Sequence, residues 1–404
     1  MQKADQLIHT KLRLPFTRPE LVPRPRLQEQ VSLGLKGPLT LITAPAGFGK
    51  TTLLASWIAG NGMPAAWFSL DKEDNEEGRF LGYLLAALQG VDDGFGREGF
   101  RLLEASQPAP AEPVLTSLIN DLDAASREIA LVLDDYHFIN SQAVHEAVSF
   151  LIDHCPRTFH LVIATRSDPP LPIARLRARG QCMELRAADL SFTELEAARF
   201  LNEVMGLRLD AASVLRLNER TEGWIAGLQM AALSMQHRED VSGFIEAFSG
   251  TNRYILDYLL EEVLAGQPAE VQRFLLRTSI LERLAAPLCD ALLVEEDESM
   301  IDGTDPWTRP GPYSGGGSAS ILEYLDRASL FLVRLDDEQT WYRYHHLFAD
   351  LLRAQLQKDL GPGEVTRLHL RAADWHEQNG PILEAIQHAS LASDEERVER
   401  LVVK

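Results

Sequence analysis

Cysteine is scarce in this chain, which has only three in its 404 residues: Cys155, Cys182 and Cys289. They lie far apart, and no pair has the short spacing of a zinc site. Small secreted domains that depend on disulfides are rich in cysteine, so a disulfide framework is not indicated. The composition fits a reducing cytoplasm.

Long apolar runs are missing as well. The first residues, MQKADQLIHTKLRLPF, contain no apolar stretch of the kind found in a signal peptide. No later window offers the ~20 uninterrupted apolar residues that a membrane-spanning helix needs. We therefore expect a cytoplasmic protein with no membrane partner.

Positive charge is in deficit, with 39 Lys and Arg against 59 Asp and Glu and a formal net charge of -20. Proteins that grip nucleic acid by general attraction cluster Lys and Arg against the phosphates. We therefore expect any DNA-binding part to lie elsewhere. The chain stops in a helical pattern, DEERVERLVVK, without a terminating signal, so we expect it to be a fragment of a longer protein.

The remaining composition is that of a globular protein, with 45% hydrophobic and 24% charged residues, and the length predicts two to four domains. In the first half, apolar strands alternate with helices, which predicts a parallel sheet covered on both faces. The predicted strands are PLTLITA (38–44), AAWFSL (65–70), IALVLDDYHFI (129–139), which ends in paired aspartates, and FHLVIATRSD (159–168).

Beyond about residue 190 the strand signals stop and helices dominate, with Ser191 or Thr193 as a candidate cap. The stretch 295–320 is acidic and then rich in Gly, Pro and Ser, which predicts a mobile loop. A helix, a two-stranded hairpin with a turn around Asp336 to Gln339 and a further helix follow, an order that is typical of a winged helix. The tail from 364 onward is expected to begin a helical repeat array.

These signals divide the chain into five parts. They are an N-terminal strap (1–35), an α/β domain (36–190), a helical domain (191–250), a winged-helix domain (251–358) and the start of a further helical region (359–404).

The segment APAGFGKT (44–51) matches the phosphate-loop pattern, with Ala44 in place of the first glycine. Backbone N–H groups around Gly47, Phe48 and Gly49 can cradle phosphates. The side chain of Lys50 can reach the β- and γ-phosphates, the Thr51 hydroxyl can hold Mg²⁺, and Thr52 follows in the motif. The alternative is a chance glycine turn that opens a helix, but the preceding strand and following helix are the context that the motif requires.

Two further strand ends carry charged residues. In phosphate-loop proteins an acidic strand end supplies the aspartate that organises Mg²⁺, which is here Asp134. Asp135 beside it is a candidate general base that polarises water. Arg166 ends the next strand and is expected at the same carboxyl edge of the sheet, as a sensor of the γ-phosphate. The alternatives are a plain strand-to-turn junction for the aspartates and a surface ion pair for Arg166.

Nearly the whole chain resembles a known family, the STAND-class signalling ATPases, and within it the large ATP-binding LuxR-type transcriptional activators typified by the maltose-regulon activator MalT. The resemblance is carried by the segments KLRLPFTRPELVPRPRL, TAPAGFGKTTLLASW, LVLDDYHFI, LVIATRSDPPLPIARLRARG, LSFTELEAARFL, TEGWIAGLQMAAL, FLLRTSILERLAAPLCDALL and YRYHHLFADLLRAQL. It implies that 36–190 is a P-loop nucleotide-binding domain and that 359–404 begins a helical sensor region. The family architecture runs from the nucleotide-binding domain through a helical domain and a winged helix to an inducer-sensing array and a C-terminal DNA-binding helix-turn-helix. The last two are missing or barely begun here.

The resemblance also implies roles for single residues. Val22, Pro23 and Arg24 would line the adenine pocket, where the alternative is a proline-rich connector. His345, ahead of its neighbour His346, would approach the β-phosphate of ADP, where the alternative is an ordinary packed or capping histidine.

Two classes of function remain open. The first is a switch that ADP holds closed. ATP and a small-molecule or protein inducer would open it for self-association. DNA would then be bound only through a domain outside this chain, and any ATPase activity would be weak. The second is a P-loop enzyme whose turnover is its purpose, but neither the strand-binding features of a motor nor the acceptor pocket of a kinase is visible. A STAND-type immune effector would share this core and differ only in its terminal domains.

Overall fold

The computed structural model describes residues 7–16, 20–105, 111–125, 127–236, 240–293, 317–336 and 338–403. The chain forms two compact units, Met1–Gly206 and Leu207–Lys404. The finer division into five parts remains a prediction. Most of the loop predicted at 295–320 lies outside the described residues, and its end was wrong, because α16 already begins at Gly317.

A five-stranded parallel sheet forms the centre of the first unit, in the order β2-β3-β4-β1-β5. Its strands are β1 (Leu39–Thr43), β2 (Ala65–Ser69), β3 (Ile129–Asp134), β4 (Phe159–Thr165) and β5 (Cys182–Arg186). The four predicted strands are all present, although β3 stops at Asp134 and the residues after Asp135 turn into a short 3-10 helix, η4 (Tyr136–Phe138). The fifth strand, β5, was not predicted.

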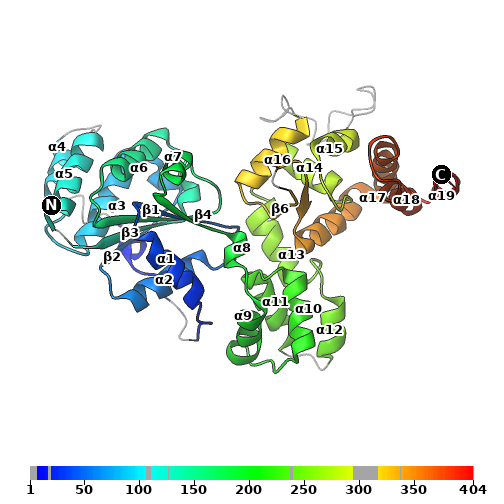
Figure 1. The fold of residues 1–404 in the computed structure, drawn as a ribbon, viewed down its shortest axis with the longest axis horizontal. Coiled ribbons are helices and arrows are strands. Elements are labelled where there is room, and N and C mark those ends of the chain that lie inside the picture. The colour runs from blue at the N-terminus through cyan, green and yellow to red at the C-terminus, as the bar shows by residue number, and fades with distance from the viewer. Residues whose placement is uncertain are drawn as a thin grey trace. The chain divides into compact units, whose positions relative to one another are not determined.

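The sheet is buried on both faces, as a parallel sheet requires. Alternate residues such as Leu41, Leu131 and Ile163 pack into a core with α3, α5 and α6. In Figure 1, α1 and α2 lie on the opposite face. The helices of this unit are α1 (Pro25–Gly34), α2 (Lys50–Asn61), α3 (Glu77–Gln89), α4 (Arg97–Ala105), α5 (Ala111–Ala125), α6 (Gln142–His154), α7 (Ile173–Ala178), α8 (Ala187–Leu190) and α9 (Glu194–Arg199).

The two ends of this unit are capped and fastened by specific side chains. Thr193, one of the two predicted caps, starts α9 with a capping box in which its hydroxyl accepts from the N–H of Glu196. The N-terminal segment crosses to the edge strand β2, where Lys11 pairs with the buried Asp74 of η3 (Lys72–Asn75). This ion pair fastens the N-terminal segment to the first unit.

Where the structure describes it, the second unit is helical apart from one isolated bridge between Leu284 and Tyr342 and one antiparallel hairpin, in which β6 (Leu332–Arg334) pairs with β7 (Tyr342–Tyr344). The predicted order of helix, hairpin and helix is confirmed. The longest helix, α17, is broken at Gly361 (φ 73°), directly before Pro362. The helices are α10 (Ala211–Thr221), α11 (Ile225–Met235), α12 (Val241–Ala247), α13 (Arg253–Leu259), α14 (Ala269–Thr278), α15 (Ala286–Leu293), α16 (Gly317–Arg327), α17 (His346–Asn379), α18 (Ile382–Leu391) and α19 (Glu395–Val402).

In the parts of the chain that the structure describes, no helix combines the length and apolar character needed to cross a bilayer.

Candidate functional site

The loop between β1 and α2 turns through two glycines with left-handed backbone angles, Gly47 at φ 79° and Gly49 at φ 77°. Glycine adopts this region at no steric cost, whereas a residue with a Cβ does not. Phe48 between them is buried and anchors the loop. The turn leads directly into Lys50, the first residue of α2, so that backbone N–H groups gather at the start of a twelve-residue helix.

Lys50 is buried, and its Nζ donates to the carbonyl oxygens of Ala44 (2.7 Å) and Pro45 (3.0 Å) of the same loop. Burial and, second, the nearby charge of Arg166 lower the pKa of Lys50 to about 8. Two cations held close to each other are unfavourable, and an anion between them would relieve this repulsion. The electrostatics of Lys50 therefore fit a phosphate ligand.

Thr51 and Asp134 meet across the base of the loop, where the Thr51 hydroxyl donates to Asp134 Oδ2 at 2.9 Å. The second carboxylate oxygen, Oδ1, is buried and has no hydrogen-bond partner among the described residues. Burial, followed by the charge of Asp135, raises the pKa of Asp134 to about 6. A buried carboxylate with an unsatisfied oxygen beside a hydroxyl suits a hard cation such as Mg²⁺. Thr52, the next residue, is exposed.

Magnesium usually takes one or two carboxylates from the protein and its remaining ligands from phosphates and water. The described residues include no group of three or more His, Cys, Asp or Glu that could hold a metal by themselves. The pair of Thr51 and Asp134 therefore fits a cation that a bound phosphate helps to hold.

Asp135 and Arg166 lie at the same carboxyl edge of the sheet. Strand β4 runs between β1 and β3, so that Arg166, which follows its last residue, comes out between the phosphate loop and the aspartates. Asp135 has a left-handed backbone (φ 58°) and a side chain that is 41% exposed, far more open than that of Asp134. The fold thus brings together five of the predicted residues: Lys50, Thr51, Asp134, Asp135 and Arg166.

The N-terminal strap is fastened within the first unit by Arg24. Its guanidinium is buried, donates to Leu190 O at 2.8 Å and stacks on Phe192 at 4.9 Å. Further acceptors of this guanidinium are the Ser191 carbonyl and both carboxylate oxygens of Glu196. These protein groups already engage the guanidinium of Arg24. Val22 is half-buried and Pro23 exposed, and the adenine contact of all three remains a prediction.

His345 lies in the second unit, directly before α17. Its Nε2 donates to the carbonyl oxygen of Thr221 at 2.9 Å, whereas its Nδ1 is buried without a hydrogen-bond partner among the described residues. Burial lowers the pKa of His345, so the neutral ring presents a lone pair at Nδ1. A hydrogen bond donated from Nδ1 to a phosphate would require the charged ring. His346 is instead exposed, with Nδ1 2.9 Å from Glu222 Oε1.

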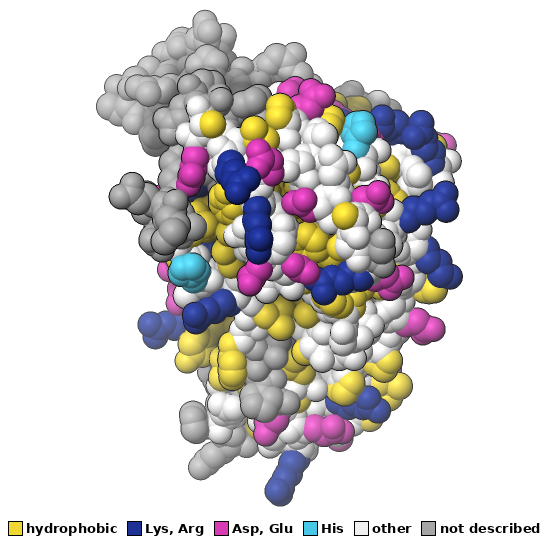
Figure 2. Space-filling view, turned by 90° about the vertical axis from the view of Figure 1, so that its left-hand side faces the viewer, with side chains coloured by type: hydrophobic (Ala, Val, Ile, Leu, Met, Phe, Trp, Pro, Cys, Tyr) yellow, Lys and Arg dark blue, Asp and Glu magenta, His cyan; other side chains and the backbone are white. Residues whose placement is uncertain are grey.

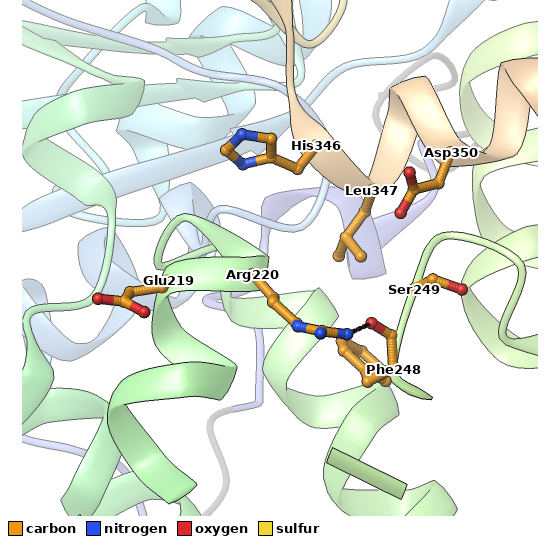
Figure 3. Close-up of a pocket in the computed structure, with 7 residues that line it drawn as sticks. All are labelled: Glu219, Arg220, Phe248, Ser249, His346, Leu347 and Asp350. Atoms are coloured by element: carbon orange, nitrogen blue, oxygen red, sulfur yellow. Dashed lines mark hydrogen bonds between the residues drawn. The ribbon is translucent and has the colours of Figure 1, made fainter. Parts of the chain in front are cut away.

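A cavity of about 410 Å³ lies beside the start of α17 (Figure 3). It includes His346 but none of the predicted ligand residues, and the Arg220 guanidinium beside it donates to the Phe248 carbonyl. The lining residues are Glu219, Arg220, Phe248, Ser249, His346, Leu347 and Asp350.

A smaller polar cavity of about 280 Å³ lies in the first unit, in the loops that follow β3 and β4. Its wall includes His137, three residues after Asp134, which the sequence analysis did not single out. Its position two residues after the acidic pair in LVLDDYHFI was the only sequence signal that pointed to it. The cavity is lined by Tyr136, His137, Ile139, Asn140, Gln142, His145, Thr165, Ser167, Asp168, Pro169 and Pro170.

Known proteins share this sequence over nearly its full length. Residues 260–364 match the family described as the MalT winged helix domain. The chain is 35% identical over 396 residues to the serine/threonine-protein kinase PknK of Mycobacterium tuberculosis, covering 97% of this chain and 34% of that protein. It is 36% identical over 390 residues to the HTH-type transcriptional regulator MalT of Serratia proteamaculans, covering 96% of this chain and 41% of the regulator. The chain thus spans between a third and about two fifths of the length of these curated relatives.

A more distant likeness is found among solved structures. A STAND protein with a tetratricopeptide repeat sensor from Pyrococcus horikoshii aligns with a TM-score of 0.39 and 15% identity, covering 96% of this chain and 50% of that one. A likeness at this level says nothing of function.

Proposed function

We propose that this chain, a member of the MalT-type family, is a nucleotide-dependent switch that binds ATP and ADP with Mg²⁺. The observation that carries this proposal is the meeting of Lys50, Thr51 and Asp134 around a glycine turn. Lys50 would contact the β- and γ-phosphates, and backbone N–H groups from Gly47 to Gly49 would cradle them. Thr51 and Asp134 would hold the cation, which neutralises phosphate charge when bound.

We further propose that hydrolysis at this site is slow, because a switch needs a long-lived state more than it needs turnover. Asp135, exposed at the edge of the sheet, would hold water for attack. Arg166 would sense the γ-phosphate from the end of β4. The rate would lie well below the ~1 to 100 s⁻¹ of typical kinases.

The resting state would be a monomer closed over ADP. The strap residues Val22, Pro23 and Arg24 would contribute to the adenine pocket. His345, charged when it meets a phosphate, would donate to the β-phosphate, a contact that differs between closed and open states as a two-state switch requires. An inducer and ATP would open the protein for self-association, and DNA would be bound through a domain outside this chain.

A second candidate is the control of a protein kinase rather than of transcription. It is favoured by the 35% identity to the kinase PknK over 97% of this chain. The switch would work in the same way, and only the domain that it controls would differ. A phosphotransfer assay and a promoter-binding assay on the full-length gene product distinguish the two.

Nucleotide binding is tested with Lys50→Ala. Charge-assisted hydrogen bonds to phosphate in a desolvated site are worth a few kcal/mol, so the variant should bind Mg²⁺–ADP and Mg²⁺–ATP roughly a hundredfold more weakly by calorimetry. Lys36→Ala, which removes an exposed lysine of the same unit, is the matched control and should bind like the parent. Equal affinity of Lys50→Ala and the parent would reject the proposed phosphate site.

A further inference from the structure

His137 lies beside the candidate water-holding carboxylate with an unused nitrogen. Its side chain is only 13% exposed, and its Nδ1 is buried with no hydrogen-bond partner among the described residues. The nearest carboxylate oxygen is Asp135 Oδ1, at 3.8 Å. An N–H···O hydrogen bond is about 2.7 to 3.2 Å long, so the two atoms lie within 1 Å or so of bonding distance.

The backbone around His137 is fixed by contacts on both sides. The neighbouring Tyr136 is buried, and its hydroxyl hydrogen-bonds His145 Nδ1 of α6 at 2.9 Å. On the other side, the side chain of Asn75 donates to Phe138 O at 2.8 Å. The imidazole itself packs on the Phe138 ring, with the centroids 4.3 Å apart. The ring is therefore held in place beside the more exposed Asp135 carboxylate.

The ring is also uncharged over the physiological range. Burial and then the charges of Arg166 and Lys50 lower the pKa of His137 to about 3. These two cations are the groups that face the expected phosphates, so the imidazole lies near the reacting end of the site. A neutral imidazole carries one N–H and one acceptor nitrogen, so donation from Nδ1 to Asp135 requires the tautomer with its proton on Nδ1.

We propose that His137 is a positioning residue for Asp135, whose carboxylate it fixes by a hydrogen bond from Nδ1–H when nucleotide is bound. In structures without ligand, catalytic hydrogen bonds are often long and tighten in the reacting complex, which agrees with the 3.8 Å separation. Fixing the carboxylate would aim it at the water that attacks the γ-phosphate. The inference rests on the proposed nucleotide site and adds a residue to it.

The test compares two substitutions. His137→Phe keeps the ring packing on Phe138 but removes both nitrogens, whereas the amide introduced by His137→Asn would keep an N–H donor near the position of Nδ1. Calorimetry measures the affinity for Mg²⁺–ADP alone and with aluminium fluoride, which mimics the γ-phosphate in transit. Outer contacts of this kind are typically worth 10- to 100-fold. We expect His137→Phe to bind the aluminium fluoride complex 10- to 100-fold more weakly, with ADP affinity unchanged, and His137→Asn to recover most of the loss.

Two controls separate positioning from packing. His154→Phe alters another histidine that packs on a phenylalanine, Phe150, and should match the parent. When His137→Phe is added to the Asp135→Asn variant, the affinity for the aluminium fluoride complex should fall little further, because the partner carboxylate is already gone.

Failure of the proposed nucleotide site and failure of the positioning role of His137 give different results. If the parent binds no ADP, the proposed nucleotide site fails and the inference falls with it. If the parent binds ADP but His137→Phe binds the fluoride complex equally well, or both His137 variants lose ADP alike, only the positioning role is overturned. Additive losses in the pair with Asp135→Asn overturn it too.

Discussion

Lys50 is buried at one edge of the sheet near the positive charge of Arg166, and the two effects together make the phosphate loop sensitive to pH. The pKa of Lys50 is lowered to about 8, first by burial and then by Arg166. Without a ligand, the ammonium therefore loses its proton within reach of physiological pH. Binding an anion favours the charged form, so nucleotide affinity and protonation of Lys50 are linked.

This linkage predicts that Mg²⁺–ADP affinity falls as pH rises. Below the pKa of about 8 Lys50 is charged, whereas at pH 9 only about a tenth of it is, so affinity should be roughly tenfold weaker at pH 9 than at pH 7. The nucleotide phosphates titrate near pH 6 and do not contribute above pH 7.5. Calorimetry across pH 7 to 9.5 measures the effect.

Lys50→Arg provides the comparison, because a guanidinium stays charged over this range. Its affinity, whatever its absolute value, should be flat with pH. A parental affinity that is constant up to pH 9.5 would show that Lys50 does not titrate as the structure indicates.

Single residues differ in how far the sequence could reveal them. That Lys50, Thr51 and Asp134 lie together was predictable, because a motif fixes their order along the chain and strand ends in a parallel sheet meet at one edge. The position of His137 beside them was not, because one histidine after an acidic pair has no distinctive pattern. The engagement of Arg24 by carbonyls near Leu190 was also hidden, since it joins residues 166 positions apart.

Among the elements, strands with a distinctive apolar pattern were predicted and the strand without one was not. β1, β3 and β4 are fully buried and appear in the sequence as apolar runs. β5 lies at the edge of the sheet and carries Glu184 and Arg186, which pair with each other. Its charged residues interrupt the apolar pattern, and only pairing with β1 identifies it as a strand.

Three buried histidines join α17 to α18. His369 Nδ1 lies 2.9 Å from His388 Nδ1, so one ring must donate and the other accept. The ring of His376 stacks on His388 with centroids 5.7 Å apart. Burial, followed by the charge of Arg353, lowers the pKa of His369. Burial also lowers the pKa of His376, and the charge of Glu384 opposes this. Burial and then the other two histidines lower the pKa of His388 to about 4.

This cluster predicts that the α17–α18 hairpin loosens in mild acid. Folding lowers the pKa of His388 from 6.5 to about 4, so the unfolded chain binds this proton more readily than the folded one. The free energy of unfolding is therefore at its maximum above pH 6.5 and falls as the pH drops toward about 4. The loss should reach about 2 to 3 kcal/mol at pH 4.5, because one pKa unit is worth about 1.4 kcal/mol. Hydrogen exchange of peptides from 364–391, corrected for intrinsic pH dependence, measures it.

His388→Gln should reduce this acid sensitivity, since glutamine can still hydrogen-bond His369 but does not titrate. His9→Gln removes an exposed histidine and should leave the profile unchanged. Parallel pH profiles for the parent and His388→Gln would assign the acid response to other groups.

At the scale of the whole molecule, charge opposes contact with nucleic acid, although the second unit contains a winged-helix domain. A fold alone does not bind DNA; a row of available cations does. The arginines of the hairpin are instead paired with acids. Arg343 makes two hydrogen bonds of 2.8 Å to Glu222, and Arg334 pairs with Asp326. On the face of the first unit drawn in Figure 2, basic and acidic side chains are interspersed.

We therefore expect that residues 1–404 do not bind duplex DNA. Lys and Arg side chains that neutralise DNA phosphates release the counterions of the DNA, and this release drives non-specific binding with dissociation constants of roughly 10⁻⁴ to 10⁻⁶ M. A chain with a formal net charge of -20 should release few of them. Fluorescence anisotropy of a labelled duplex at about 50 mM salt, where such binding is strongest, should show no change up to about 100 μM protein, with ADP or with ATP. A micromolar affinity that weakens steadily with the logarithm of salt concentration would contradict this, and would mean that the winged helix presents cations that the pairs with Glu222 and Asp326 do not neutralise.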